Sequence, residues 1–207
     1  MDGLMFDTER IGLAAFCYAA RAHGYNDTEK NFMKLIGMTV EDADQAIFQA
    51  FGTNFPLKAV RRERERYLSR IRKTSGIPMK AGLIELVKFL DEKGIPLGLA
   101  SSSSRTIIEE NLAHFQLSRY FQCILSGDEI THGKPHPEIY LKAARCLSKK
   151  PSTCLVLEDS VRGIVSAYAA GMIPVMVPDI EKPRESVKKM AHAVFSSLHE
   201  VQTYLSS

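Results

Sequence analysis

The sequence predicts an α/β protein, with a parallel sheet covered by helices on both faces and an inserted α-helical segment. Two observations lead to this prediction. From residue 78 onward, short apolar runs alternate with segments of helical periodicity, which is typical of parallel sheets. Between residues 10 and 77 the apolar residues recur at helical spacing, with no convincing strand. A chain of 207 residues is long enough for one such domain with an insertion.

The first part of the chain is expected to be a helical unit. Its helices should cover residues 11–21, 41–50 and 57–73. The third helix carries alternating charges, which we interpret as a solvent-exposed face with pairs such as Arg61 and Glu65 rather than as a nucleic-acid surface. The segment from Thr74 to Pro78 contains glycine and proline and marks a hinge.

The second part alternates between helix and strand. In order, we expect a helix at 82–93, a strand at 96–100, a helix at 105–115, a strand at 121–125, a helix at 137–147, a strand at 154–157, a helix at 161–170, and strands at 173–177 and 193–195. The carboxyl ends of parallel strands meet at one edge of a sheet, where α/β proteins bind their ligands. Polar residues at these ends are therefore candidates for a functional site.

Composition limits the classes of protein to consider. A formal net charge of +3 is too small to indicate a nucleic-acid partner. No apolar stretch approaches membrane-spanning length, and the four cysteines form no C-x-x-C pair. We therefore expect a soluble cytoplasmic protein with reduced thiols. We expect it to bind neither nucleic acid nor a membrane, and its size is compatible with a monomer.

Two adjacent carboxylates follow the apolar run Leu155 to Leu157. Glu158 and Asp159 would emerge at the carboxyl edge of a buried strand, where carboxylates can hold Mg²⁺ together with a phosphate group. The alternative is that Asp159 or Ser160 only caps the helix that follows. The two acids alone do not decide between these interpretations.

Two other strand ends offer complementary groups. Ser101, Ser102, Ser103 and Ser104 follow one strand and begin a helix, where hydroxyls and backbone N–H groups can bind an anion. One serine would suffice as a simple helix cap. Lys134 lies in a loop stiffened by Gly133 and Pro135, although a lone surface lysine is the usual alternative. Hydroxyls, a lysine and two carboxylates at successive strand ends together predict a site for phosphate and Mg²⁺.

Four segments, in this order, resemble motifs of one enzyme family. They are residues 1–9 (MDGLMFDTE), 99–103 (LASSS), 133–137 (GKPHP) and 157–160 (LEDS). On these motifs the chain resembles the haloacid dehalogenase superfamily, and within it the β-phosphoglucomutase-like phosphatases with a helical cap. The resemblance covers essentially the whole chain. It implies a Rossmann-like α/β core formed by residues 1–9 and 78–207, with residues 10–77 as a helical cap that closes over the substrate.

The resemblance also implies a role for each motif residue. Asp2 would be the general acid/base, Ser101 and Ser102 would bind the phosphoryl group, and Lys134 would neutralise its charge. Mg²⁺ would be held by Asp2, Glu158 and Asp159. The implied activity is Mg²⁺-dependent hydrolysis of a small phosphorylated metabolite such as a sugar phosphate. This fits phosphoryl transfer, which depends on positioning and on charge neutralisation.

One element of the family pattern is missing. The family's nucleophilic aspartate stands two residues before Asp2, and this chain has only Met1 before Asp2. The apolar strand that leads to the nucleophile, which is the central strand of the family's sheet, is missing with it. We expect either that the parent protein is longer, or that the short form is a protein without covalent catalysis. We favour a parent phosphatase, with the chain as given inactive.

Other functions remain as alternatives. One is a non-catalytic protein of the same fold that binds phosphate or a partner. Another is a true β-phosphoglucomutase, which carries a cap histidine where this chain has Gly12 and a cap arginine where it has Val40. These two differences favour hydrolysis over transfer to a second sugar position. His132 and His136 flank Lys134 but are interpreted as solvent-exposed loop residues rather than metal ligands.

Overall fold

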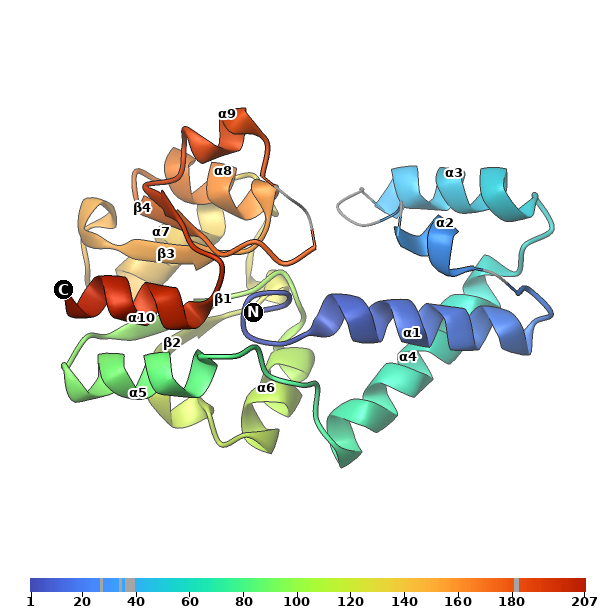
Figure 1. Ribbon diagram of the computed structural model, residues 1–207, viewed down its shortest axis with the longest axis horizontal. Helices are drawn as coiled ribbons and strands as arrows, with labels where there is room; N and C mark the ends of the chain where they lie inside the picture. Colours follow the sequence, from blue (N-terminus) through green and yellow to red (C-terminus); the bar gives the residue numbers. More distant parts are fainter. Residues whose placement is uncertain (27, 34, 36–39, 181–182) are drawn as a thin grey trace. The chain divides into compact units, whose positions relative to one another are not determined.

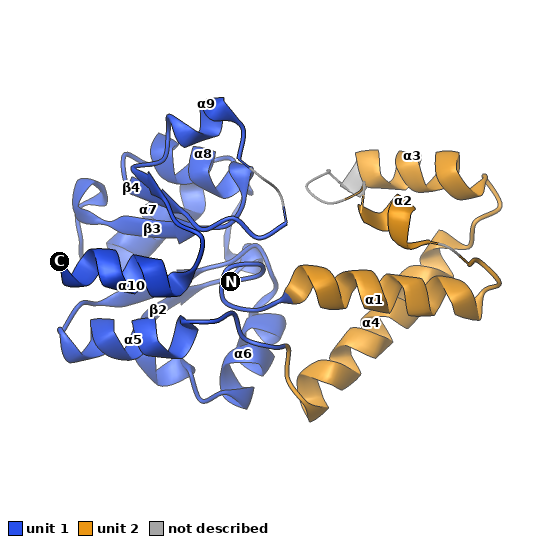
Figure 2. Ribbon diagram, viewed as in Figure 1, with its two compact units in different colours: residues 1–7, 78–207 blue, residues 8–77 orange. Residues whose placement is uncertain are grey.

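The structure is a computed structural model that describes residues 1–26, 28–33, 35, 40–180 and 183–207. The chain divides into two compact units, shown in different colours in Figure 2. One consists of residues 1–7 and 78–207, and the other of residues 8–77. Within the described residues, no helix is both long enough and apolar enough to cross a lipid bilayer.

The unit of residues 8–77 is helical. It contains α1 (Thr8–Ala22), α2 (Glu29–Met33), α3 (Val40–Phe51) and α4 (Leu57–Thr74). The short helix α2 was not predicted, since its five residues show no complete apolar period. Aromatic residues form much of the core, in which the rings of Phe16 and Phe55 stack with centroids 6.3 Å apart. This unit therefore has its own apolar core.

The other unit has the predicted alternation of helices and parallel strands (Figure 1). In chain order it contains α5 (Leu83–Glu92), β1 (Leu97–Ala100), α6 (Arg105–His114), β2 (Phe121–Leu125), α7 (Glu138–Cys146), β3 (Leu155–Glu158), α8 (Val161–Ala169), β4 (Ile173–Met176), α9 (Glu185–Lys188), β5 (Ala193–Val194) and α10 (Leu198–Ser206). The sequence analysis did not predict α9 and α10. Ser197 caps α10 by accepting a hydrogen bond from the Glu200 N–H at 3.3 Å.

The strands form two parallel sheets where the sequence led us to expect one. In the first sheet β1 pairs with β2, from Leu97 opposite Phe121 to Ala100 opposite Leu125. In the second, β4 lies between β3 and β5. Strands β1 and β3 are not paired with each other in the part of the chain that the structure describes. Each is therefore the edge of its sheet.

An apolar cavity of about 550 Å³ lies between these two edges. Its lining includes all four residues of β1 and all four of β3, together with apolar side chains from α5, α7 and α10. It has the layout of a sheet layer, with strands at its sides and helices above and below. Met1 also lines it.

The unused backbone groups of both edges face this cavity. On β1 the Ser101 N–H donates to the Leu125 carbonyl at 3.0 Å, and on β3 the Glu158 carbonyl accepts from Val177 N–H at 2.7 Å. Successive residues of a parallel strand direct their backbone groups to opposite sides. The groups that turn away from the existing partners therefore belong to Gly98, Ala100, Leu155 and Leu157, all of which line the cavity.

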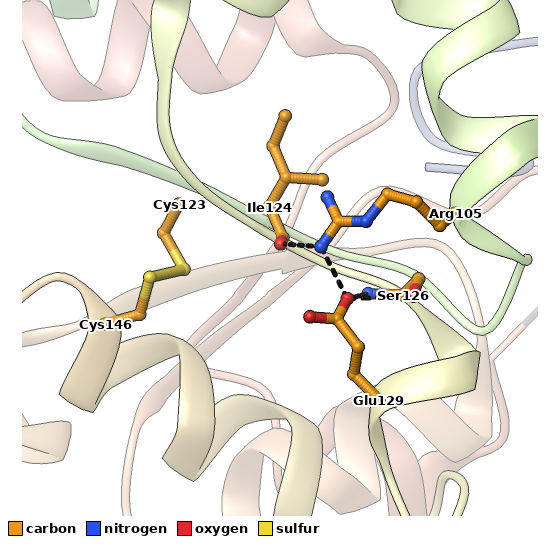
Figure 3. The surroundings of a disulfide bond; sticks show 6 residues. All are labelled: Arg105, Cys123, Ile124, Ser126, Glu129 and Cys146. Carbon is orange, nitrogen blue, oxygen red and sulfur yellow. Dashed lines mark hydrogen bonds and ion pairs between the residues drawn. A yellow bond between two sulfur atoms is a disulfide. The ribbon is translucent and has the colours of Figure 1, made fainter.

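A disulfide joins β2 to α7, which contradicts the expectation of four reduced thiols. Cys123 and Cys146 are bonded, with their Cα atoms 6.0 Å apart (Figure 3). Cys17 and Cys154 are free. The sequence did not reveal the pair because its two members are 23 residues apart and on different elements, and only the packing of α7 against β2 brings them together.

Candidate functional site

The carboxyl ends of β1 and β3 are linked by one lysine. The Lys134 ammonium donates a hydrogen bond to the Glu158 carboxylate at the end of β3, and lies 3.5 Å from the Ala100 carbonyl at the end of β1. The Lys134 side chain is only 11% exposed. It comes from the predicted loop between β2 and α7, so three segments distant in sequence meet at this edge.

Asp2 lies at the same edge. Its Oδ2 accepts hydrogen bonds from the Ser103 hydroxyl at 2.8 Å and from the Ser101 hydroxyl at 3.3 Å. The turn that carries Asp2 is tight, with Gly3 at φ +70°, and it is tied to the rest of the unit by the Lys80 N–H, which donates to the Met5 carbonyl at 2.8 Å. The first motif and the serine run are thus in direct contact.

Glu158 is a buried carboxylate with a full set of partners. Lys134 and the Tyr140 hydroxyl both donate to its Oε1, and the Ser160 hydroxyl is 3.1 Å from its Oε2. Burial acts to raise the pKa of Glu158, but the charges of Lys134 and the N-terminus, with the hydrogen bonds from Lys134 and Tyr140, outweigh burial and hold the pKa at about 2. Glu158 is therefore the ionised counter-ion of Lys134.

Helix α8, which follows β3, leaves room for the Glu158 carboxylate because residue 163 of the helix is a glycine. A Cβ at Gly163 would lie 2.0 Å from the Glu158 carboxyl carbon. The Gly163 N–H also donates to Ser160, the N-cap of α8, at 3.1 Å. The capping role considered for Ser160 is thus present together with the buried acid, so the two interpretations of this segment do not exclude each other.

Asp159 has a different environment. Burial and the neighbouring charge of Glu158 raise the pKa of Asp159 to about 7. The backbone of Gly3 packs directly on it, since a Cβ there would lie 2.1 Å from Asp159 Oδ2. The half-buried Asp159 therefore holds a proton more readily than the buried Glu158 beside it, and a cation bound at this edge would favour the ionised form of Asp159.

Arg105, at the start of α6, holds the serine run next to the end of β2. Its guanidinium donates to the Ile124 carbonyl at 2.8 Å and to Glu129 Oε2 at 2.5 Å (Figure 3). Glu129 in turn accepts from the Ser126 N–H at 2.8 Å. The Gly127 N–H donates to the Ser103 carbonyl at 2.9 Å. These contacts fix the turn that presents Ser101 and Ser103 to Asp2.

The structure brings five of the six predicted site residues into one connected cluster. Asp2 contacts Ser101, Lys134 contacts Glu158, and Asp159 packs against Gly3. The sixth residue, Ser102, is exposed, and it is its backbone, not its side chain, that packs against Gly127. Sequence reasoning did not single out Ser103 from the serine run, and it missed Tyr140. Ser103 belongs to the serine run, where four identical residues give no order of importance, and Tyr140 looks like a core residue of α7.

Comparisons with known proteins identify the family to which the chain belongs. A family model described as haloacid dehalogenase-like hydrolase matches residues 1–177. Hexitol phosphatase B of Escherichia coli K12 is 30% identical over 204 residues, which cover 97% of this chain and 91% of that protein. A phosphorylated carbohydrates phosphatase of Thermotoga maritima is 31% identical over 176 residues, covering 83% of this chain and 79% of that one.

A solved structure shares the fold over the whole chain. It is a Thermotoga maritima protein assigned provisionally as a β-phosphoglucomutase, with a TM-score of 0.82 and 28% sequence identity. The match covers 100% of this chain and 95% of that chain.

Proposed function

The chain belongs to the haloacid dehalogenase-like hydrolase family, among its β-phosphoglucomutase-like phosphatases, and we propose that its fold hydrolyses phosphate monoesters of small carbohydrate-like metabolites. The observation that supports this most directly is the cluster of Asp2, Ser101, Lys134 and Asp159 around the carboxyl ends of β1 and β3. The relatives named for hexitol and carbohydrate phosphates support the substrate class.

Each residue of the cluster would have a separate task. Ser101 would donate a hydrogen bond to the phosphoryl oxygens, and Lys134 would offset their charge, whereas the exposed Ser102 has no such contact with the cluster. Asp2, held by two serine hydroxyls, would give a proton to the leaving alkoxide and later take one from water. Glu158 would hold the Lys134 ammonium at the strand ends.

The residues at this edge fit a magnesium ion. Asp159 is a half-buried carboxyl group beside a second, ionised carboxylate, and together they offer hard oxygen donors of the kind that Mg²⁺ prefers. Asp159 would be a direct ligand, and Asp2 would contribute an oxygen other than the one that transfers the proton. Both Glu158 oxygens already have hydrogen-bond partners, so Glu158 would act from beside the ion. When bound, Mg²⁺ would neutralise charge on the phosphate.

Covalent catalysis would require a nucleophile at the strand ends, and the cavity between β1 and β3 has room for a strand that could carry one. A strand parallel to both edges would pair with the backbone groups of Gly98, Ala100, Leu155 and Leu157 and fill an apolar layer. Its last residue would reach the strand ends where Lys134 lies. We propose that an aspartate at that position is the nucleophile, and that the chain does not hydrolyse phosphate esters while the gap is empty.

The helical unit of residues 8–77 is proposed to act as the cap that selects the substrate and excludes water. Gly12, where a mutase of this family has a histidine, packs against Arg64: a Cβ there would lie 3.1 Å from the Arg64 guanidinium. The second difference from a mutase, Val40, cannot be placed in the same way. Gly37, Met38 and Thr39 lie outside the described residues, and the Val40 side chain is not described. Gly12 supports hydrolysis over transfer.

The proposal can be tested by filling the gap. A variant would carry an extension of five apolar, β-branched residues and one aspartate placed directly before Met1. We expect this variant to release inorganic phosphate from sorbitol 6-phosphate with Mg²⁺, whereas the chain without the extension does not. The matched control replaces the added aspartate by asparagine, which keeps the strand and removes the nucleophile.

The outcomes separate the competing functions. If the aspartate variant folds with a higher melting temperature but releases no phosphate from a panel of sugar and hexitol phosphates, the hydrolase proposal is wrong. Retained binding of inorganic phosphate by that inactive variant would favour the non-catalytic, phosphate-binding alternative. Transfer between positions of a hexose phosphate would identify a mutase.

A further inference from the structure

A second group of potential metal ligands lies on the loop before α7 and at the first residue of that helix. It consists of His132, His136 and Glu138, whose candidate ligand atoms all lie within 4.8 Å of one another. His132 Nδ1 is 3.2 Å from Glu138 Oε2, and the two imidazole rings have centroids 4.6 Å apart. The group contains none of the carboxylates of the proposed magnesium site.

Glu138 is held in place independently of the histidines. Lys142 donates to its Oε1 at 2.8 Å, and the N–H groups of Thr131 and His132 donate to its two oxygens at 3.0 and 2.9 Å. Because these hydrogen bonds fix its orientation, the Glu138 carboxylate is preorganised to bind a metal ion. Its Oε2 is on the side of the His132 ring, away from Lys142.

The two histidines can adjust at low cost. The His132 side chain is 63% exposed and His136 is also exposed, so rotating either ring breaks few contacts. The His136 ring contacts the His132 ring, and its Nδ1 accepts a hydrogen bond from the Glu138 N–H at 3.2 Å, which a rotation of the ring would break. His132 and His136 lie four residues apart in the same loop, and His136 is two residues before Glu138.

We propose that His132, His136 and Glu138 bind a divalent transition-metal ion of the Zn²⁺ class, with water as the fourth ligand. Two imidazoles and a carboxylate are a ligand set typical of zinc sites with an open position. Zn–N and Zn–O bonds of about 2.0–2.2 Å place tetrahedral ligands roughly 3.4 Å apart. The His132 and Glu138 atoms are already 3.2 Å apart, and His136 completes the set by a rotation of its ring.

The ligand types also separate this site from the proposed magnesium site. Imidazole nitrogen favours Zn²⁺, Ni²⁺ and Cu²⁺, whereas Mg²⁺ prefers oxygen ligands. Saturating Mg²⁺ therefore leaves the histidine site available. Lys134 stands between the two histidines in the chain, so a bound metal would clamp the loop that carries this lysine at both of its ends.

The experiment is isothermal titration of the chain with ZnCl₂ in excess MgCl₂. We expect one binding event that is lost or weakened by about tenfold or more in His132→Asn and His136→Asn, since removing a metal-site residue typically has at least this effect. Glu138→Gln should also weaken it. The His23→Asn variant, which changes an exposed histidine of the other unit, and Cys154→Ser, which removes a free thiol, should bind as the unchanged chain does.

A visible absorption spectrum with CoCl₂ provides a second measurement. Four-coordinate Co²⁺ gives intense d–d bands, which we expect for the chain and not for the His132→Asn/His136→Asn double variant. The proposal is wrong if Zn²⁺ does not bind, or if the double variant binds it with unchanged affinity while circular dichroism shows that it is folded. Because the test uses neither substrate nor added strand, it fails or succeeds independently of the hydrolase proposal.

Discussion

The Lys134 ammonium and the Glu158 carboxylate form a buried ion pair at the edge where the two sheets face each other. Lys134 is 11% exposed and Glu158 is 7% exposed, so little water remains to compensate either charge. A third group, the Tyr140 hydroxyl, donates to the same carboxylate, and burial raises the pKa of Tyr140 well above its ordinary value. Tyr140 therefore stays a hydrogen-bond donor at all ordinary pH values.

Removing one charge of this pair is expected to destabilise the fold. Lys134→Met leaves the Glu158 carboxylate buried without its counter-ion, and breaking a buried pair in this way costs about 3 kcal/mol. Urea unfolding followed by circular dichroism measures the loss in the free energy of unfolding. The double variant with Glu158→Gln should recover part of it, because no unpaired charge remains. Equal losses in the single and double variants would contradict the assignment of a coupled pair.

Stability should fall with rising pH because of Asp159. Its pKa is raised from 3.8 to about 7 in the fold, so the folded state holds a proton that the unfolded chain has released. The stabilising contribution is full below about pH 4 and is lost as the pH rises to about 7. With about 1.4 kcal/mol for each pKa unit, the loss is at most about 4 kcal/mol. Glu158, with its lowered pKa, acts only below this range.

Asp159→Asn tests this prediction in metal-free buffer. Melting temperatures measured between pH 5 and pH 8 should decline less in the variant than in the unchanged chain. Added Mg²⁺ should raise the melting temperature more at pH 8 than at pH 5, because the ion binds the ionised carboxylate. An identical decline in both proteins would assign the pH dependence to another group.

The glycine below Glu158 should tolerate no side chain. In Gly163→Ala the new Cβ would overlap the Glu158 carboxyl group, and overpacking of this kind costs about 1–3 kcal/mol. Gly133→Ala is the matched control, because a Cβ there meets no atom within 4 Å. Thermal unfolding of both variants gives the comparison, and a Gly163→Ala protein as stable as the control would show that the carboxylate moves aside freely.

Thiol counting tests the disulfide between Cys123 and Cys146. Of the four cysteines, the structure leaves Cys17 and Cys154 free. Denatured, unreduced protein should therefore react with two equivalents of a thiol reagent, and four after reduction. Reduction should also lower the free energy of unfolding by about 3 kcal/mol, as expected for a closed loop of this length. Four reactive thiols before reduction in a protein purified under air would contradict the bond.

The alternation of helix and strand in the second unit could be predicted because each element has a clear period and ends at glycine, proline or a polar residue. The helix α2 and the late helices α9 and α10 were missed, since they are short or follow irregular segments. Division into two sheets was not predicted either. Whether β1 and β3 belong to one sheet depends on what lies between them. The sequence pattern of each strand does not indicate which strand is its neighbour.

At the site, residue type and position after a strand were enough to select Ser101, Lys134, Glu158 and Asp159, whereas Asp2 was selected only through the resemblance of residues 1–9 to a family motif. They were not enough to separate the roles of the two acids. Although they are adjacent in sequence, Glu158 and Asp159 have opposite pKa shifts, because Glu158 is paired with Lys134 whereas burial and the charge of Glu158 raise the pKa of Asp159. Such differences arise from three-dimensional neighbours alone.

The apolar cavity between β1 and β3 also affects how the protein responds to compression. Apolar space of this kind is lost when the chain unfolds, so the volume change of unfolding is expected to be more negative than that of a fold without such a cavity. Hydrostatic pressure therefore acts on this fold as a denaturant. A segment or small apolar molecule that fills the cavity would make the same protein stiffer under pressure, while the helical unit of residues 8–77 would be unaffected.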